Sequence, residues 1–376
     1  MRGEAAKVVV YPSSNNPYQI LLYRYYSRSH PCRLRFIAGP RTLADFLLHL
    51  ARLSGSLIAS RLRGYDILHV HWVYGLRFPG TSVVPPLSKA ISTLQILAFL
   101  WLVRCCRFKL VWTVHDLVPL NNFMLWEKAM SQRLIKESSA IVLLAEETKD
   151  GMDAVGLTYD PDKTFVIPHG NYIDWYVNTI SRETARKSLG IPESAFVFLF
   201  FGNIHPYKNV SLLIEQFMKI SSSFPEAHLV IAGMTANSTI LKEVLAAREN
   251  GAGQIIADLN YVENERVQLF YNAADIAVHP FRQITNSGSV LLSASFGKGV
   301  IAPRLGALKE LPDDIGLFYQ PDDAAGLERQ LRQAISDRLS VERMGKAALI
   351  YAKSLSWEDI AEETHRVYRF VSGESL

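Results

Sequence analysis

Two short stretches of the sequence combine residue types that could do chemistry. His115 and Asp116 directly follow the apolar run Leu110–Val114. A histidine or a carboxylate at the end of a strand could accept a proton from a hydroxyl group. Gly202 is followed six positions later by Lys208, and a glycine turn with a nearby lysine suits phosphate. The sequence therefore holds a candidate base and a candidate phosphate site, with a strand-end histidine and a helix-capping or turn aspartate as the alternative interpretation of the first.

The first half of the chain alternates between strand and helix patterns. Pro12–Pro17 breaks the chain after the first strand, and a helix is expected from Tyr18 and another over residues 43–62. The expected strands cover residues 7–11, 33–37, 66–72, 109–116, 140–144 and 164–171. This alternation predicts a parallel sheet that is covered by helices on both faces.

A second alternation follows a polar region at residues 171–194, where we place the linker and expect a helix with Arg182, Glu183, Arg186 and Lys187 before Gly190. Its expected strands cover residues 196–201, 227–232, 254–256, 276–279 and 299–302, with helices at 210–222, 239–250, 263–272 and 289–296. The sequence predicts an N-terminal domain over residues 1–175, a C-terminal domain over 176–355, and a final helix over 356–376 that crosses back to the first domain.

Polar side chains follow the expected strands of the first domain. In a doubly wound sheet, the carboxyl ends of the strands border the ligand crevice. The candidate acceptor-binding residues at these ends are Asn15, Asn16, Tyr18, His71 and Trp72. Turn and cap roles remain the alternative for the first three. His69 alternates onto the same face as His71, and we interpret it as a structural histidine because no third zinc ligand lies at useful spacing.

Positive charge is concentrated in the first third of the chain. The whole chain of 376 residues is 49% hydrophobic and has a net charge of +4, but residues 1–112 alone carry +12. Such a field attracts an anionic surface, such as phospholipid or a lipid pyrophosphate. Nucleic acid is disfavoured because no binding motif accompanies the basic residues. Cys32, Cys105 and Cys106 form no disulfide framework, which favours a reducing, cytoplasmic compartment.

The apolar run Leu94–Val103 is about half the length that a bilayer-spanning helix needs. Basic residues follow it, and Trp101 is placed where an interfacial aromatic residue would be useful. We predict a helix that lies in the membrane surface rather than crossing it, with a buried helix of the domain as the alternative. The predicted membrane contacts are Leu97, Leu100, Trp101, Arg104 and Arg107. No signal peptide is expected.

Several of these segments, in this order and spacing, resemble the GT-B glycosyltransferases, and within them the family 4-like, or glycosyltransferase group 1, enzymes of bacterial polysaccharide synthesis. The resemblance is carried by His115-Asp116, Ile167–Gly170, Gly202–Lys208, Ile231–Gly233, Ala273–Ile276, Gly297–Ala302 and Ser356–Glu358. It implies two Rossmann-like, doubly wound parallel-sheet domains facing a cleft, with the donor in the second domain and the acceptor in the first.

The resemblance also implies a donor site for a nucleotide diphosphate sugar, UDP- or GDP-linked. No metal-ligand cluster is evident in the sequence, so we expect catalysis that needs no metal or cofactor. Gly202 and Lys208 match the family pattern, but Asn203 stands where an arginine is usual, so part of the diphosphate clamp must come from elsewhere. The usual pair of glutamates is missing from residues 281–296. The further candidate donor residues are Asn286, Ser287, Gly288, Ser289 and Glu310.

The implied activity is transfer of a hexose from this donor to a lipid-linked saccharide in bacterial exopolysaccharide or related glycan synthesis, at the inner face of the plasma membrane. Asp116 would be the base of an inverting reaction, whereas in a retaining one His115 would contact the donor sugar and no protein base would be needed. The alternatives are an inactive sugar-nucleotide-binding or scaffold protein, a GT-B enzyme with a soluble acceptor, and a GT-B epimerase or phosphorylase.

Overall fold

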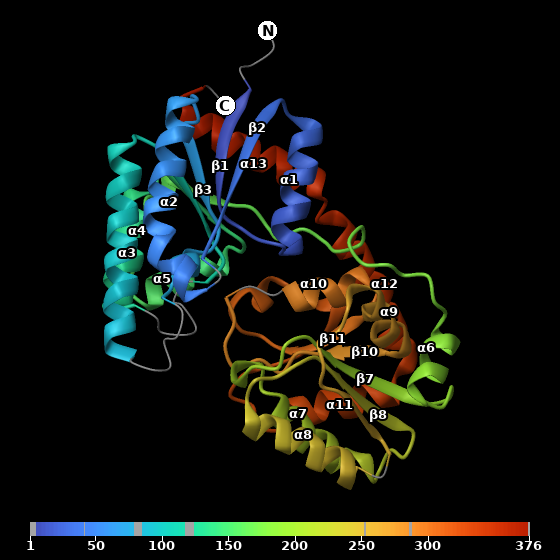
Figure 1. The fold of residues 1–376 in the computed structure, drawn as a ribbon. Helices are drawn as coiled ribbons and strands as arrows, with labels where there is room; N and C mark the ends of the chain where they lie inside the picture. Colours follow the sequence, from blue (N-terminus) through green and yellow to red (C-terminus); the bar gives the residue numbers. More distant parts are fainter. Residues whose placement is uncertain are drawn as a thin grey trace. The chain divides into compact units, whose positions relative to one another are not determined.

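The computed structural model describes residues 5–40, 42–78, 85–116, 124–251, 253–285 and 288–374 (Figure 1). The chain forms two compact units, Met1–His169 together with Trp357–Leu376, and Gly170–Ser356. Each unit contains a six-stranded sheet whose paired strands are all parallel. The predicted α/β class with two doubly wound sheets is confirmed. The predicted boundary between residues 175 and 176 lies six residues beyond the division seen in the structure.

The sheet of the first unit has the strand order β2-β1-β3-β4-β5-β6. Its strands are β1 (Ala6–Ser13), β2 (Cys32–Ala38), β3 (Ile67–Val70), β4 (Lys109–Val114), β5 (Ala140–Leu143) and β6 (Thr164–Val166). The order reverses between β1 and β3, and the loops after these two strands diverge there. Ligands of open α/β sheets bind at such a switch point.

Helices cover both faces of this first sheet (Figure 1). One face is covered by α2 (Leu43–Leu62) and α3 (Pro85–Cys105), the other by α1 (Pro17–Ser29) and the final helix α13 (Trp357–Ser372). Because side chains alternate along a strand, Leu68 and Val70 of β3 join the core under α2 and α3. His69 points to the opposite face, where Tyr23 of α1 and Tyr368 of α13 lie.

The sheet of the second unit has the order β12-β11-β10-β7-β8-β9. Its strands are β7 (Phe196–Phe201), β8 (Ala227–Ala232), β9 (Ile255–Asp258), β10 (Ile276–Val278), β11 (Gly299–Pro303) and β12 (Gly316–Tyr319). If β7 to β12 are renumbered 1 to 6, the order from the β9 edge to the β12 edge is 3-2-1-4-5-6. This is the strand order of the dinucleotide-binding fold. Its switch point lies between β7 and β10, next to the turn that begins at Gly202.

The strand β7 shows why both faces of the second sheet must be covered. Phe196, Phe198 and Phe200 pack into the core under α7, α8 and α11, whereas Val197 and Leu199 pack toward α6 and α9. A strand that is apolar at every position is typical of a parallel sheet buried on both sides. The helices are α6 (Arg182–Leu189), α7 (Val210–Ser221), α8 (Ser238–Asn250), α9 (Asn264–Ala273), α10 (Gly288–Ser295), α11 (Gly326–Ser336) and α12 (Arg338–Ser354).

Some elements were not expected from the sequence. The helix α4 (Glu127–Glu137), the helices α11 and α12, and the edge strand β12 were not predicted. The short helix α5 (Glu147–Ala154) follows β5. The described residues also form the short 3-10 segments η1 (Val73–Leu76), η2 (Pro161–Lys163), η3 (Pro206–Lys208), η4 (Gly306–Glu310) and η5 (Asp313–Ile315).

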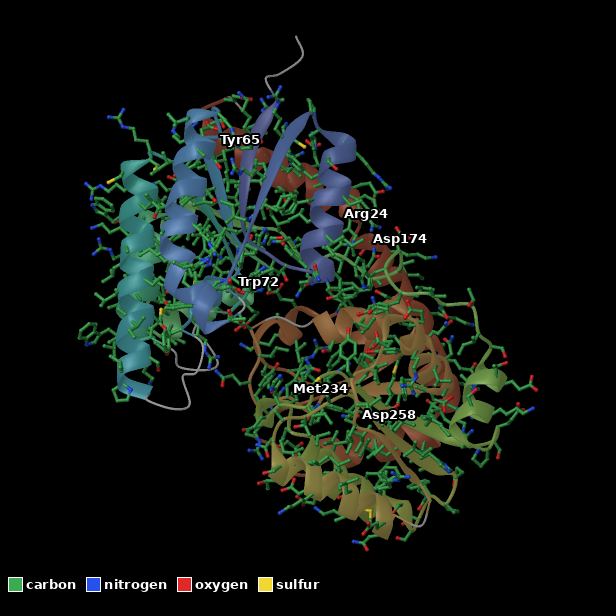
Figure 2. All side chains as sticks on the ribbon, viewed as in Figure 1. Arg24, Tyr65, Trp72, Asp174, Met234 and Asp258 are labelled. Atoms are coloured by element: carbon green, nitrogen blue, oxygen red, sulfur yellow. The ribbon has the colours of Figure 1, made fainter. Side chains whose placement is uncertain are left out.

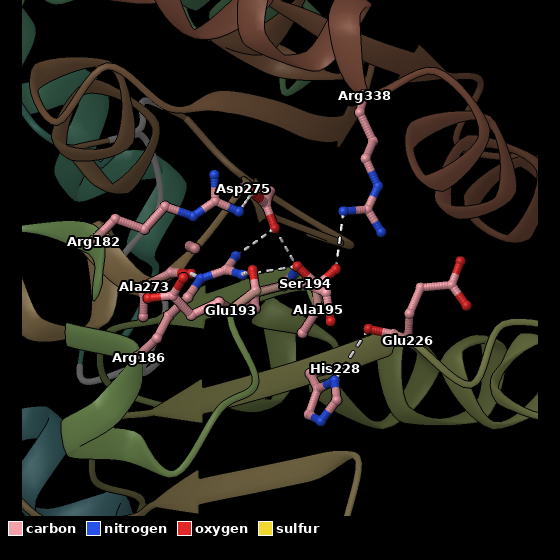
Figure 3. Close-up of polar contacts among 12 residues, drawn as sticks. Arg182, Arg186, Glu193, Ser194, Ala195, Glu226, His228, Ala273, Asp275 and Arg338 are labelled. Carbon is pink, nitrogen blue, oxygen red and sulfur yellow. Dashed lines mark hydrogen bonds and ion pairs between the residues drawn. The ribbon is translucent and has the colours of Figure 1, made fainter. Parts of the chain in front are cut away.

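The segment that we interpreted as a polar linker contains α6, which folds onto the second unit. Arg186 of this helix is 1% exposed and forms an ion pair of 2.8 Å with Asp275 (Figure 3). Its guanidinium also donates to the backbone oxygens of Ala273 and Ala195. Asp275 accepts a hydrogen bond from the backbone N–H of Val197, at the amino end of β7. This cluster therefore closes the amino end of the second sheet.

We expect Asp275→Asn to destabilise the second unit by about 3 kcal/mol, because it leaves the buried Arg186 guanidinium without its counter-charge. Urea dependence of amide hydrogen exchange in β7 and β8 measures this loss. The matched control is Glu328→Gln, which removes the half-exposed pair of Glu328 with Arg332 on α11 and should cost under about 0.5 kcal/mol. Equal stability of the two variants would contradict a structural role for the cluster.

Candidate functional site

A buried network of histidines and tyrosines lies at the carboxyl ends of β3 and β4. His69 contacts Thr113 Oγ1 of β4 through Nε2 at 2.7 Å, and its Nδ1 lies 2.6 Å from the hydroxyl of Tyr368. The Tyr23 hydroxyl joins this network, with 2.9 Å to His69 Nδ1 and 2.9 Å to His71 Nε2. His69 is thus a hydrogen-bonded structural histidine, as we interpreted it.

The network extends from His71 to the predicted site residue His115. Their ring nitrogens lie 3.5 Å apart, and His115 stacks on Trp72 with ring centres 4.6 Å apart. Burial lowers the pKa of His69 to about 3 and holds the pKa values of His71 and His115 well below the usual range. The three rings are therefore neutral near pH 7 and act as hydrogen-bonding groups.

Asp116 occupies the end of the same strand but faces different surroundings. It borders a small cavity with apolar side chains from α3, α4 and the end of β4, among them Ile96, Trp112 and Leu134. Burial raises the pKa of the Asp116 carboxyl because the charged form is poorly solvated there. A carboxylate with a raised pKa is a stronger proton acceptor, which makes Asp116 better suited than His115 to be a base.

The five predicted acceptor residues are close in the fold but differ in accessibility. Asn15 and Asn16 are exposed, and the Asn16 side chain accepts a hydrogen bond from Tyr18 N–H as the cap of α1. Tyr18, His71 and Trp72 are 2%, 1% and 6% exposed, and Figure 2 shows Trp72 beyond the end of β3. Neighbouring rings cover Tyr18 and His71 in this structure, and direct acceptor contact stays a prediction.

The helix α3 is longer than the predicted apolar run. Its residues Pro86–Cys105 are long and apolar enough to cross a membrane by length and composition, and half of that window is buried inside the protein. Leu100 is 2% exposed and packs in the core, so the prediction that it contacts a membrane is wrong. Leu97 is half-buried, whereas Trp101, Arg104 and Arg107 are exposed.

In the second unit, the turn after β7 is held closely against the end of β8. The N–H of Gly202 donates to the carbonyl of Ala232, and the N–H of Ile204 donates to that of Met234. Gly202 has a φ of 111°, which favours glycine. A Cβ atom at Gly233 would lie 2.3 Å from the Gly202 carbonyl oxygen, so a side chain there would displace the turn.

Lys208 is the central charged residue of this turn. It ends the segment η3 just before α7, is 8% exposed, and its Nζ lies 3.1 Å from where a Cβ of Gly202 would be. Burial lowers the Lys208 pKa to about 8. Within the part of the chain that the structure describes, its ammonium group has no hydrogen bond or ion pair. A buried cation without a counter-charge is unstable by itself and is stabilised by a bound anion.

The loop after β10 meets both the segment that follows the Gly202 turn and the loop after β11. The N–H of Arg282 donates to the carbonyl of Tyr207, and a Cβ at Gly306 would lie 2.3 Å from the Ile284 carbonyl oxygen. Gly288 and Ser289 are half-buried at the start of α10, while Glu310 is exposed at the end of η4. Asn286 and Ser287 lie outside the described residues. The exposed Asn203 carries no charge beside Lys208.

We predicted no role from the sequence for three residues that lie at the strand ends or contact them, His279, Tyr23 and Tyr368. His279 follows β10 and contacts Ser293 Oγ of α10 at 2.9 Å, and burial lowers its pKa to about 3. Its position after an apolar strand was the same signal that identified His71 and His115. Tyr23 and Tyr368 lie in helices, where no sequence signal marks a hydrogen bond to a distant strand. Among the described residues, no three His, Cys, Asp or Glu side chains are grouped as a metal site.

We expect anion binding at Lys208 to weaken as the pH rises through about 8, because only the protonated ammonium attracts phosphate. The folded pKa lies below the ordinary 10.5, so the charge is lost at lower pH than for an exposed lysine. Calorimetric titration with a nucleoside diphosphate between pH 6.5 and 10 should show affinity falling by about tenfold per pH unit above 8. Lys208→Arg should abolish this pH dependence, and a flat wild-type profile up to pH 9.5 would refute it.

Comparison with known proteins assigns the second unit to a sequence family. Residues 181–350 match the family model described as glycosyl transferases group 1. A GDP-mannose:glycolipid 4-beta-D-mannosyltransferase of Xanthomonas campestris is 29% identical over 284 residues, which is 74% of each chain. A D-inositol 3-phosphate glycosyltransferase of Corynebacterium efficiens is 25% identical over 89% of this chain and 80% of its own length.

Solved structures show the same fold over nearly the whole chain. Anabaena HepE in complex with UDP-glucose has a TM-score of 0.73 at 14% identity, covering 98% of this chain and 100% of its own. WaaG, a glycosyltransferase involved in lipopolysaccharide biosynthesis, has a TM-score of 0.66 at 16% identity with the same coverage. The chain therefore has the GT-B fold of these structures over nearly its whole length, and residues 181–350 of its second unit match glycosyl transferases group 1.

Proposed function

We propose that this enzyme transfers a hexose from a UDP- or GDP-linked sugar to a lipid-linked saccharide, in bacterial exopolysaccharide or related glycan synthesis. The observation that carries the donor assignment is the buried ammonium of Lys208, which has no counter-charge among the described residues at the switch point of the second sheet. A diphosphate provides that counter-charge. The helix α10 begins at Gly288, after the loop that follows β10, and the N–H groups at its start would add hydrogen bonds to the diphosphate oxygens.

The names of two similar proteins support a sugar-nucleotide donor and a lipid-linked acceptor. The Xanthomonas relative is named for GDP-mannose as donor and a glycolipid as acceptor, and HepE was solved with UDP-glucose. The basic first third of the present chain, with +12 over residues 1–112, suits an acceptor that carries a lipid pyrophosphate.

The chemistry requires a leaving group and, for inversion, a base. The acceptor oxygen forms a bond to the anomeric carbon while the bond from that carbon to the diphosphate breaks, and the diphosphate leaves with the electron pair. Lys208 stabilises the charge that develops on the diphosphate, without a metal ion. In an inverting reaction the hydroxyl proton passes to Asp116, whose raised pKa suits this role. In a retaining reaction His115 contacts the donor sugar, no protein base is needed, and the hydroxyl proton passes to an oxygen of the leaving diphosphate.

The proposal is tested by a screen of UDP-, GDP- and ADP-sugars with a lipid-linked saccharide, with the anomer of the product determined by NMR. We expect transfer from a UDP- or GDP-sugar, and a loss of about 10²–10⁴-fold in kcat for Asp116→Asn if the product is inverted. Asp153→Asn, an exposed carboxylate of α5 in the same unit, is the matched control.

Three results would overturn parts of this assignment. Nucleotide binding without transfer or donor hydrolysis would favour an inactive binding or scaffold protein. Full activity of Asp116→Asn would remove Asp116 as the base. Equal rates with a soluble saccharide and with its lipid-linked form would replace the lipid-linked acceptor with a soluble one.

We further propose that the first unit binds the inner surface of the plasma membrane through α3. Leu87, Leu94 and Trp101 are 59%, 66% and 67% exposed and recur every seven residues, which places them on one side of the helix. Exposed Arg104 and Arg107 follow them. The opposite side of α3 packs in the core of the unit, which supports a helix that lies on the surface of the bilayer.

The triple variant Leu87→Ser, Leu94→Ser and Trp101→Ser should release the enzyme from vesicles that contain anionic lipid, because it removes the apolar contact and leaves the fold intact. Flotation of the vesicles measures the bound fraction. Leu339→Ser with Ile350→Ser, which removes exposed apolar side chains from α12 of the second unit, is the control and should float like the wild type. Unchanged flotation of the triple variant would exclude this surface.

A further inference from the structure

We propose that Arg282 supplies the second positive charge of the donor diphosphate site, in place of the arginine that Asn203 replaces. This inference rests on the proposed donor site and names a residue that recognises the diphosphate. A nucleoside diphosphate carries at least two negative charges, and Lys208 offers one positive charge. Asn203 can donate a hydrogen bond but cannot neutralise the second charge.

The backbone of Arg282 is fixed beside Lys208. Its N–H donates to the carbonyl of Tyr207 at 2.8 Å, and Tyr207 directly precedes Lys208. Phe281 is 4% exposed, and its ring lies against those of Tyr207 and His279. The loop that carries Arg282 is therefore anchored between the ends of β7 and β10, which is the switch point of the sheet.

The other basic side chains described at this edge of the sheet are already engaged or neutral. The Arg304 guanidinium donates to the Leu311 carbonyl, pairs with Asp313 and lies 3.7 Å over the ring of Phe318. Partial burial and the charge of Lys208 lower the pKa of His205, so this histidine is neutral near pH 7. Lys309 is engaged elsewhere.

Arg282 differs from all of these. Its side chain is exposed, and its guanidinium makes no hydrogen bond or ion pair within the described part of the chain. A guanidinium is always charged, and its planar fork binds two phosphate oxygens at once. The geometry therefore assigns Arg282 to the diphosphate, with the consequence that the site distinguishes nucleoside diphosphates from monophosphates.

Calorimetric binding of GDP, UDP, GMP and UMP to the full-length protein tests this inference. Arg282→Gln should weaken GDP or UDP binding by about 10- to 100-fold and leave the monophosphates within about twofold, because the lost charge acts on the second phosphate. Arg248→Gln, an exposed arginine of α8 without a partner among the described residues, is the control and should bind all four nucleotides like the wild type.

A rescue experiment separates charge from structure. Adding Asn203→Arg to the Arg282→Gln variant should restore diphosphate affinity, because it returns a guanidinium to the same turn. Unchanged diphosphate binding by Arg282→Gln, or an equal loss for mono- and diphosphates without rescue, would overturn the role of Arg282 while leaving the donor site of Lys208 intact. Failure of the wild type to bind any nucleoside diphosphate would overturn the donor site itself.

Discussion

Both units of this enzyme depend on one constraint, which is that a parallel sheet must be covered on both faces. The side chains of β7 are apolar at every position because helices pack against each face. Ligand-binding groups are consequently confined to the ends of the strands, where loops diverge at a switch point. His115 and Asp116 in the first unit and the Gly202 turn in the second occupy such ends.

The two ends of the second sheet differ in whether a buried cation has a counter-charge among the described residues. At the amino end, Arg186 is surrounded by Asp275 and several carbonyl oxygens, so its charge is fully compensated within the protein. At the carboxyl end, Lys208 is buried as deeply as many core residues but has no partner among the described residues. Arg186 is therefore a structural cation, whereas Lys208 is suited to bind an anion, because an uncompensated buried charge costs several kcal/mol.

The buried polar groups at the strand ends of the first unit include uncharged histidines and tyrosines. Burial keeps His69, His71 and His115 neutral, and the Tyr23 hydroxyl holds His69 and His71, so these histidines contribute geometry rather than charge. Tyr368, which completes the contacts of His69, comes from α13 at the end of the chain. The last helix is therefore part of the support of the strand ends that carry His115 and Asp116. On the opposite side of the sheet, α3 packs one side into the core and leaves Leu94 and Trp101 exposed.

The sequence by itself determined the fold class and most strands and helices, because alternating apolar runs and glycine turns are local signals. Helix 43–62 and the strands 196–201 and 227–232 were predicted with the bounds that the structure shows. It also identified Lys208 and Asp116 as chemical candidates from their place after strands.

Which side chains are buried depends on the tertiary structure. Leu100 and Trp101 are neighbours in the same apolar run, yet one lies in the core and the other in solvent. Arg186 looked like a linker residue until α6 packed against α9, and Arg282 gained its place beside Lys208 only when two distant loops met at the switch point. These contacts join residues far apart in the chain, and local patterns carry no information about them.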